Sequence, residues 1–158
     1  MALVLTIKEA ASMEIQNLTT NKNTVESFLK CQRKAIDLDK AWHGIHYLLS
    51  GQAFEAEGPA GYLMMGGISL GEIHQDYGPA RALSPQEVAA LYGVMNLLSE
   101  DELKTRYRPE DMEEIYPGWW DPELDGEDFL YLLHYYSQLK AFLEDLVQHH
   151  KGAVVFIQ

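Results

Sequence analysis

The strongest constraint on the fold is a long amphipathic stretch near the C-terminal end, residues 125–150. Apolar side chains recur there at the three- and four-residue spacing that places them on one face of a helix. They are Phe129, Leu132, Leu133, Tyr136, Leu139, Leu143, Leu146 and Val147. A helix with one apolar stripe gains most of its stability by burying that stripe. The pattern therefore predicts a long helix packed on a core that the rest of the chain supplies.

The residues after this helix have a different pattern. Following Gly152, residues 153–157 form a short apolar and β-branched run, which is typical of a strand. We expect this strand to pair with residues 79–83 or with a strand near the N-terminus. The predicted fold is α+β, with several helices on a small sheet and a long C-terminal helix followed by a short terminal strand. A length of 158 residues suits a single compact domain covering 1–158.

Helix start signals organise the rest of the chain. Ser84, Pro85 and Glu87 combine a cap, a proline at the first helical position and a capping-box glutamate, and Ser99 with Glu102 repeats the capping box before a short helix.

Three further helices are predicted upstream. Thr6 with Glu9 predicts a helix over 7–17, a second helix starts near Thr24, and a third follows Asp39 and ends before Gly51. The glycine-rich residues 58–79 favour short strands or tight turns at 62–65 and 68–73.

Charge restricts the class of partner. The formal net charge is −12, and residues 99–128 hold half of the 24 acidic residues. Phosphate backbones and anionic membrane surfaces are repelled by such a surface, so we expect neither a nucleic-acid nor a membrane partner. The single cysteine, Cys31, permits no disulfide within the chain, and no apolar run has the length of a membrane span or signal segment. These features favour a reducing, cytoplasmic setting.

Two histidines are candidates for chemistry. His43 and His46 are spaced i, i+3 on the third predicted helix, so both could reach one metal ion with a nearby carboxylate such as Asp37 or Asp39. The metalloprotease pattern needs histidines four apart with an adjacent glutamate, which this segment lacks. His46 also falls on the apolar face with Trp42. We therefore favour histidines buried in the core, and expect no metal and no cofactor.

Arg81 is conspicuous because few basic residues surround it in the sequence. It follows the turn Tyr77-Gly78-Pro79 and precedes the Ser84 helix start. A guanidinium group offers a rigid fork of donors that suits a carboxylate. We expect Arg81 to pair with Asp37, Asp39 or Asp76. An open pocket around Arg81 would instead indicate an anion site.

Several segments share their pattern with a known family. They are residues 37–43 continuing to 49–51, Gly66-Gly67 with Gly71, residues 77–83 leading into Ser84-Pro85, and Ile115-Tyr116-Pro117. On these segments, which together span roughly residues 6–157, the chain resembles the YfbM-like family of small bacterial proteins, a domain of unknown function. The resemblance implies a compact α+β domain and no assigned activity or catalytic residue.

Two classes of function are consistent with these features. The first is a non-enzymatic acidic binding protein, of immunity or regulatory type, because residues 99–128 mix negative charge that steers a basic protein partner with aromatic side chains that anchor it. The second is a small enzyme or metal-binding protein that uses His43, His46, Asp37, Asp39 and Arg81. The candidate ligand or partner residues are Asp37, Asp39, Trp42, His43, His46, Asp76, Tyr77, Arg81, Tyr116, Trp119 and Trp120.

Overall fold

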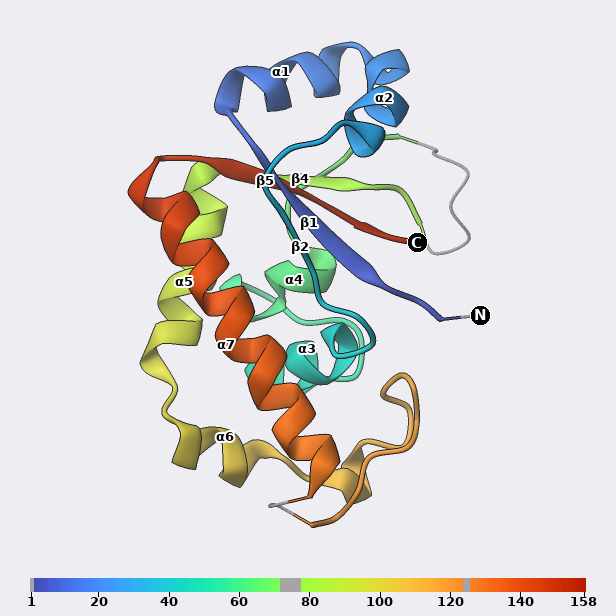
Figure 1. Cartoon of the computed structure of the whole chain (residues 1–158), viewed down its shortest axis with the longest axis vertical. Helices are drawn as coiled ribbons and strands as arrows, with labels where there is room; N and C mark the ends of the chain where they lie inside the picture. The colour runs from blue at the N-terminus through green and yellow to red at the C-terminus, as the bar shows by residue number, and fades with distance from the viewer. Residues whose placement is uncertain (1, 72–77, 124–125) are drawn as a thin grey trace.

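The computed structural model describes residues 2–71, 78–123 and 126–158 (Figure 1). The α-helices there are α1 (Ser12–Thr20), α2 (Val25–Lys30), α3 (Trp42–Ser50), α4 (Tyr62–Met65), α5 (Pro85–Leu97), α6 (Glu100–Arg106) and α7 (Glu127–Gln148). Short 3-10 helices are η1 (Lys22–Thr24), η2 (Pro59–Gly61) and η3 (Pro109–Asp111). The strands are β1 (Leu5–Ala10), β2 (Ala35–Asp37), β3 (Ile68–Ser69), β4 (Arg81–Leu83) and β5 (Gly152–Ile157). The predicted α+β class, with a long C-terminal helix and a terminal strand, is confirmed.

The described strands form one five-stranded sheet in the order β2-β1-β5-β4-β3, and all neighbouring strands are antiparallel. The terminal strand β5 lies at the centre. It pairs with β1 along its whole length and with β4 on its other side. Both predicted pairings of the terminal strand therefore occur together, and a central position explains why its sequence is apolar throughout.

Helices cover both faces of the sheet. Val154 and Phe156 on β5 pack with Val25 and Phe28 of α2, whereas Ala153 and Val155 belong to the larger core on the opposite face. Figure 1 shows α1 and α2 beyond one face and α3, α5 and α7 on the other side. Successive side chains of a strand point to opposite faces, so β5 joins the two hydrophobic clusters.

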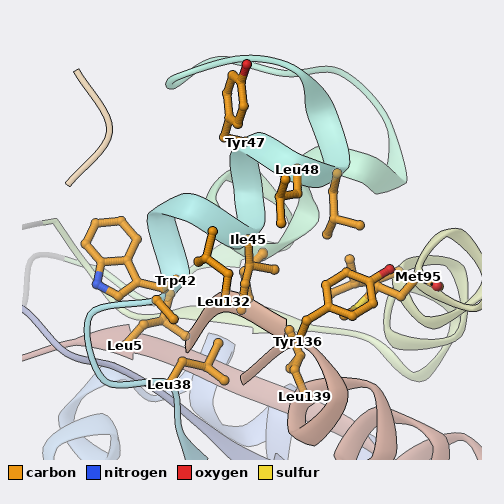
Figure 2. Close-up of a cluster of buried hydrophobic side chains, with 14 of the residues drawn as sticks. Leu5, Leu38, Trp42, Ile45, Tyr47, Leu48, Met95, Leu132, Tyr136 and Leu139 are labelled. Atoms are coloured by element: carbon orange, nitrogen blue, oxygen red, sulfur yellow. Dashed lines mark hydrogen bonds between the residues drawn. The ribbon is translucent and has the colours of Figure 1, made fainter. Parts of the chain in front are cut away.

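The larger core lies between α3, α5, α7 and the sheet. Figure 2 shows Ile45 and Leu48 of α3 directed toward Leu132 and Tyr136 of α7. The predicted stripe on α7 is largely confirmed as buried, with Leu133 and Val147 at its margin. At the centre of the stripe, Leu139 is fully buried.

A glycine allows the close contact between α3 and α7. A Cβ atom at Gly44 would lie 2.6 Å from Cδ2 of Leu132 and 3.1 Å from Cη2 of Trp120. The absence of a side chain therefore lets α3 approach both Leu132 and Trp120.

The capping signals in the middle of the chain are confirmed. Ser84 Oγ accepts a hydrogen bond from the N–H of Glu87 at 3.1 Å, and the Glu87 carboxylate accepts from the N–H of Ser84 at 2.9 Å. Ser99 Oγ likewise accepts from the N–H of Glu102 at 3.1 Å, and α6 ends before Pro109. Helices after Thr24 and Asp39 are also present, as α2 and α3.

Two predicted elements are wrong. The helix expected over 7–17 is instead strand β1 followed by α1, and the first turn of α1 is closed by Glu14, which accepts from the N–H of Ala11 at 2.9 Å. Pairing with β2 and β5 outweighs the local Thr6–Glu9 signal. Residues 62–65, expected as a strand or turn, form α4. Within 68–73, also expected as a strand or turn, β3 covers Ile68–Ser69, and residues 72–73 lie outside the described residues.

Candidate functional site

His43 joins two segments that are distant in the sequence. Its Nε2 lies 2.5 Å from the carbonyl oxygen of Ala53, and its Nδ1 accepts a hydrogen bond from the N–H of Tyr116 at 2.8 Å. Because Nδ1 accepts, the ring is neutral and its proton is on Nε2, which donates to Ala53. The side chain is buried, and this burial lowers the pKa of His43 below its usual value.

Aromatic rings surround His43 at the start of α3. The Trp42 ring stacks on His43 with centroids 5.2 Å apart and on Tyr116 at 5.7 Å. The indole N–H of Trp42 donates to the carbonyl of Leu3 at 2.9 Å, and the N–H of Leu3 donates to the Tyr116 hydroxyl at 2.9 Å. Each polar group of this stack has a partner, so the arrangement holds its rings in fixed positions.

An open pocket with a volume of about 390 Å³ lies beside this stack, and we call it the Tyr116 pocket. Its lining is mainly apolar and aromatic, from Leu3, Trp42, Phe54, Met64, Tyr116 and Pro117. Glu113 and Glu114 add two exposed carboxylates, and His43 and Gly118 complete the lining together with Ile115. The structure thus brings together Trp42, His43 and Tyr116 from the set of predicted site residues. Sequence reasoning did not assign Phe54 or Met64 to a site.

His46 points to the same loop as His43 but is not available for chemistry at the surface. Its Nε2 lies 2.7 Å from the carbonyl oxygen of Phe54, and its side chain is fully buried. Nδ1 has no hydrogen-bond partner among the described residues. Burial lowers the pKa of His46, and the nearby His43 and Arg81 add to this effect. The two histidines therefore fasten the loop carrying Phe54 to α3.

The five residues of the second function class do not converge. Across residues 2–71, 78–123 and 126–158, no group of three His, Cys, Asp or Glu side chains is placed to hold a metal ion. Both ring nitrogens of His43 are used by backbone groups. Asp37 is exposed and accepts from the N–H of Asp39 at 2.7 Å. The cluster that the sequence suggested is thus divided between the core and the surface.

Arg81 caps a helix, and it pairs with no carboxylate of the described residues. Its guanidinium donates to the carbonyl oxygens of Tyr62 at 3.1 Å, Leu63 at 2.5 Å and Gly66 at 2.7 Å. The carbonyls of Leu63 and Gly66 lie toward the C-terminal end of α4, where helical carbonyls lack intrahelical partners, whereas the Tyr62 carbonyl also accepts from the N–H of Gly66 at 3.1 Å. Burial lowers the pKa of Arg81 to about 10. The predicted pairing with Asp37 or Asp39 is wrong, because neither carboxylate contacts Arg81.

Asp76 and Tyr77 lie outside the described residues. The candidate pairing of Arg81 with Asp76 therefore stays a prediction.

A second group of site residues gathers where α7 passes the turn before α3. The Tyr131 hydroxyl donates to Oδ2 of Asp39 at 2.7 Å and accepts from the N–H of Lys40 at 3.0 Å. Asp39 has a φ of 49°, a left-handed conformation that aspartate tolerates better than most residues. Burial, followed by the hydrogen bond to Asp39, raises the pKa of Tyr131.

Trp119 extends this group over the surface. Its ring contacts Tyr131 with centroids 5.9 Å apart, and Tyr131 contacts Tyr135 at 5.1 Å. Burial raises the pKa of Tyr135, and the nearby carboxylates of Asp39 and Asp37 raise it further. We call Asp37, Asp39, Trp119, Tyr131 and Tyr135 the acidic aromatic surface. The two tyrosines are i, i+4 neighbours beside the apolar stripe of α7, a signal that sequence reasoning did not use.

The two adjacent tryptophans have different environments. Trp119 is 45% exposed, whereas Trp120 is 9% exposed and donates its indole N–H to the carbonyl of Ile115 at 3.0 Å. Their rings are in contact, with centroids 5.0 Å apart. Trp120 therefore belongs to the core and supports Trp119 from beneath.

The sequence shows no apolar run long enough to span a membrane, and the helices of the structure can be compared with that expectation. In the described part of the chain, no helix combines the length and the apolar character that crossing a bilayer requires.

A solved structure shares this fold over nearly the whole chain. The crystal structure of YfbM from Escherichia coli, a protein of unknown function, is similar, with a TM-score of 0.78 and 24% sequence identity. The similarity covers 98% of this chain and 99% of that chain. No curated protein matches this chain. The model of one family, described as a domain of unknown function (DUF1877), matches residues 4–156, and the chain therefore belongs to the DUF1877 family.

Proposed function

We propose that this protein is a non-enzymatic binding protein, of immunity or regulatory type, that recognises a basic protein partner through the acidic aromatic surface. The observation that carries the proposal is the position of Trp119. Its ring is 45% exposed while it rests on Trp120 and Tyr131. An exposed tryptophan supported by packed aromatic rings is the kind of side chain that anchors protein interfaces, because little conformational entropy is lost when it is buried.

Charge next to Trp119 supports a basic partner. Asp39 accepts from the Tyr131 hydroxyl, and the carboxylate of Asp37, two residues earlier, is held by its bond to the N–H of Asp39. These two carboxylates are thus positioned before any partner arrives. A net charge of −12 adds a long-range field that speeds encounter with a positively charged protein. The same field supports the proposal that neither nucleic acid nor an anionic membrane is a partner.

The enzyme or metal-binding alternative has less support. His43 and His46 donate to backbone carbonyls inside the protein, and Arg81 caps α4. His43 and Arg81 are therefore satisfied in structural roles. His46 keeps an unpaired Nδ1 but is fully buried, so it has no access to a substrate at the surface. We also propose the reducing, cytoplasmic setting that a single cysteine favours.

Affinity capture with matched variants tests this function. Immobilised wild-type protein, Trp119→Ala and a control Leu97→Ala, whose side chain is 80% exposed, are each incubated with lysate of the native host. We expect a basic protein on wild type and on Leu97→Ala, and its loss on Trp119→Ala. The captured protein is then purified and titrated calorimetrically against wild type, Asp39→Asn and Trp119→Ala.

The titrations decide the outcome. Weaker binding to both variants, and weaker binding by wild type as salt rises, supports the proposal, because steering charges are screened by ions. A captured partner that is acidic, or that binds Trp119→Ala as tightly as wild type, overturns it.

A further inference from the structure

We propose that the Tyr116 pocket receives one arginine side chain of the basic partner. This inference rests on the proposed function, and it adds the chemistry of a single anchoring residue. The pocket is close to the acidic aromatic surface, because Gly118 lines the pocket and the next residue is Trp119. A partner seated on Trp119 therefore has the pocket within reach of a neighbouring side chain.

The walls of the pocket suit the aliphatic part and the flat head of arginine. Phe54 is 52% exposed, and with Met64 and Pro117 it provides apolar surface for methylene groups. Long cationic side chains bury their stems on such surfaces and keep the charged head at the edge. A guanidinium is planar and stacks on aromatic faces, which the Phe54 and Tyr116 rings provide, so arginine fits better than lysine.

The charges of the pocket suit a cation. Glu113 and Glu114 are exposed, and neither forms a hydrogen bond or ion pair with another described residue. No lysine or arginine is among the described residues that line the pocket, and His43 is neutral. An anionic anchor would meet two like charges, and a purely apolar anchor would desolvate the carboxylates without compensating them. A guanidinium at the edge satisfies both carboxylates with charge-assisted hydrogen bonds.

The pocket is also held in shape without a ligand. His43 binds the Phe54 loop through Ala53 and the opposite wall through the N–H of Tyr116. The Trp42 indole and the Tyr116 hydroxyl are tied to Leu3. Because these bonds are made in the free protein, little ordering cost remains for binding.

A titration with small peptides tests the inference directly. Isotope-labelled full-length protein is followed by NMR during addition of the blocked tripeptide acetyl-Gly-Arg-Gly-amide. The matched probe replaces arginine by citrulline, which has the same shape without the charge. We expect the arginine peptide to shift the amide signals of Tyr116 and Gly118 and the indole signal of Trp42. We expect the citrulline peptide to bind about tenfold more weakly, because an ionised donor strengthens each hydrogen bond.

Variants distinguish binding in the pocket from a general attraction between the peptide and the negatively charged protein. The double variant Glu113→Gln/Glu114→Gln should weaken the arginine peptide by about fivefold, since exposed ion pairs are modest. The control Glu110→Gln/Glu144→Gln removes the same charge from exposed positions outside the pocket and should bind like wild type. Phe54→Ala should weaken the arginine peptide through loss of wall contact, and its unfolding midpoint in urea reports whether the fold is kept.

The outcomes distinguish this inference from the proposed function. Equal binding of the citrulline peptide, equal losses in both double variants, or no shift at Tyr116 and Gly118 overturns the arginine pocket. If the pocket fails while a basic partner still depends on Trp119, the proposed function stands. If the arginine peptide binds the pocket but no basic protein depends on Trp119, the proposed function is wrong, and the pocket is a cation site of another kind.

Discussion

The N–H of Tyr116 donates to Nδ1 of His43 across 2.8 Å, and the other ring nitrogen of His43 bonds to Ala53. A protonated His43 would place an N–H donor against the N–H of Tyr116. The neutral ring is therefore a condition for holding the two walls of the Tyr116 pocket together.

This relationship predicts a loss of stability in weak acid. Burial lowers the folded-state pKa of both His43 and His46, so the unfolded chain binds more protons than the folded protein once the pH falls below about 6.5. The free energy of unfolding should be independent of these histidines near pH 8. It should fall as the pH drops through about 6.5 toward the folded pKa values, by at most about 1.4 kcal/mol per pH unit for each histidine.

Urea unfolding at pH 7.5, 6.5 and 5.5 checks this slope. His46→Gln should flatten the slope, while His134→Gln, which changes an exposed histidine, should leave it unchanged. A wild-type protein equally stable at all three values would contradict the prediction. The depressed pKa of Glu14 acts at lower pH, below its ordinary value of 4.5, and does not enter this range.

Elemental analysis provides a test of the metal alternative. We expect protein prepared without chelator or His tag to contain no stoichiometric transition metal, because both nitrogens of His43 are engaged by backbone groups. Near one equivalent of zinc that disappears in His46→Ala would overturn the ranking and favour the metal-binding class over the binding protein.

Arg81 should contribute to stability through α4. Arg81→Met keeps much of the stem but removes the donors from the carbonyls of Tyr62, Leu63 and Gly66. The Tyr62 carbonyl keeps the N–H of Gly66, but those of Leu63 and Gly66 lose their donor. Carbonyls left without partners cost about 1–3 kcal/mol, so we expect a loss of that size in urea melts. Arg108→Met is the control, since Arg108 is exposed. Equal effects of the two substitutions would show that the cap contributes little.

Shortening a buried side chain in the centre of the α7 stripe should lower the free energy of unfolding. Leu139 is fully buried, so Leu139→Ala removes packed methyl groups and leaves a cavity, with an expected loss of about 2–5 kcal/mol. The exposed control Leu97→Ala should change the free energy of unfolding by less than about 0.5 kcal/mol. A Leu139→Ala effect as small as the control would contradict close packing at this position.

The hydroxyl of Tyr131 should contribute more to the free energy of unfolding than the hydroxyl of Tyr135. Tyr131→Phe removes the donor to Asp39 and the acceptor for the N–H of Lys40, with an expected cost of about 0.5–1.5 kcal/mol. The hydroxyl of Tyr135 has no hydrogen bond to another described residue, so Tyr135→Phe should be close to neutral. Thermal melts of the two variants, measured side by side, give the comparison. A smaller effect at position 131 than at 135 would refute the role of the bond.

Elements with a strong local signal could be predicted from the sequence. The stripe of α7 repeats at helical spacing, and the Ser84 and Ser99 caps act within three residues of themselves. The burial of His46 also follows from its place on the apolar face of α3. Elements whose local sequence signal is outweighed by contacts with distant residues could not be predicted, and β1 is the clearest case. Its backbone hydrogen bonds go to β2 and to β5, which lies at the other end of the chain.

The candidate site shows the same division. Sequence alone determined the acidic charge, the aromatic content of residues 113–120 and the apolar face of α3 that carries Trp42 and His46. Only the tertiary structure decided that Tyr131 meets Asp39 across 92 positions, and that Arg81 meets carbonyls of α4 instead of Asp37 or Asp39. A side chain in the sequence has many possible partners of suitable chemistry. Which one it meets depends on packing between distant elements, and that packing is absent from any local pattern.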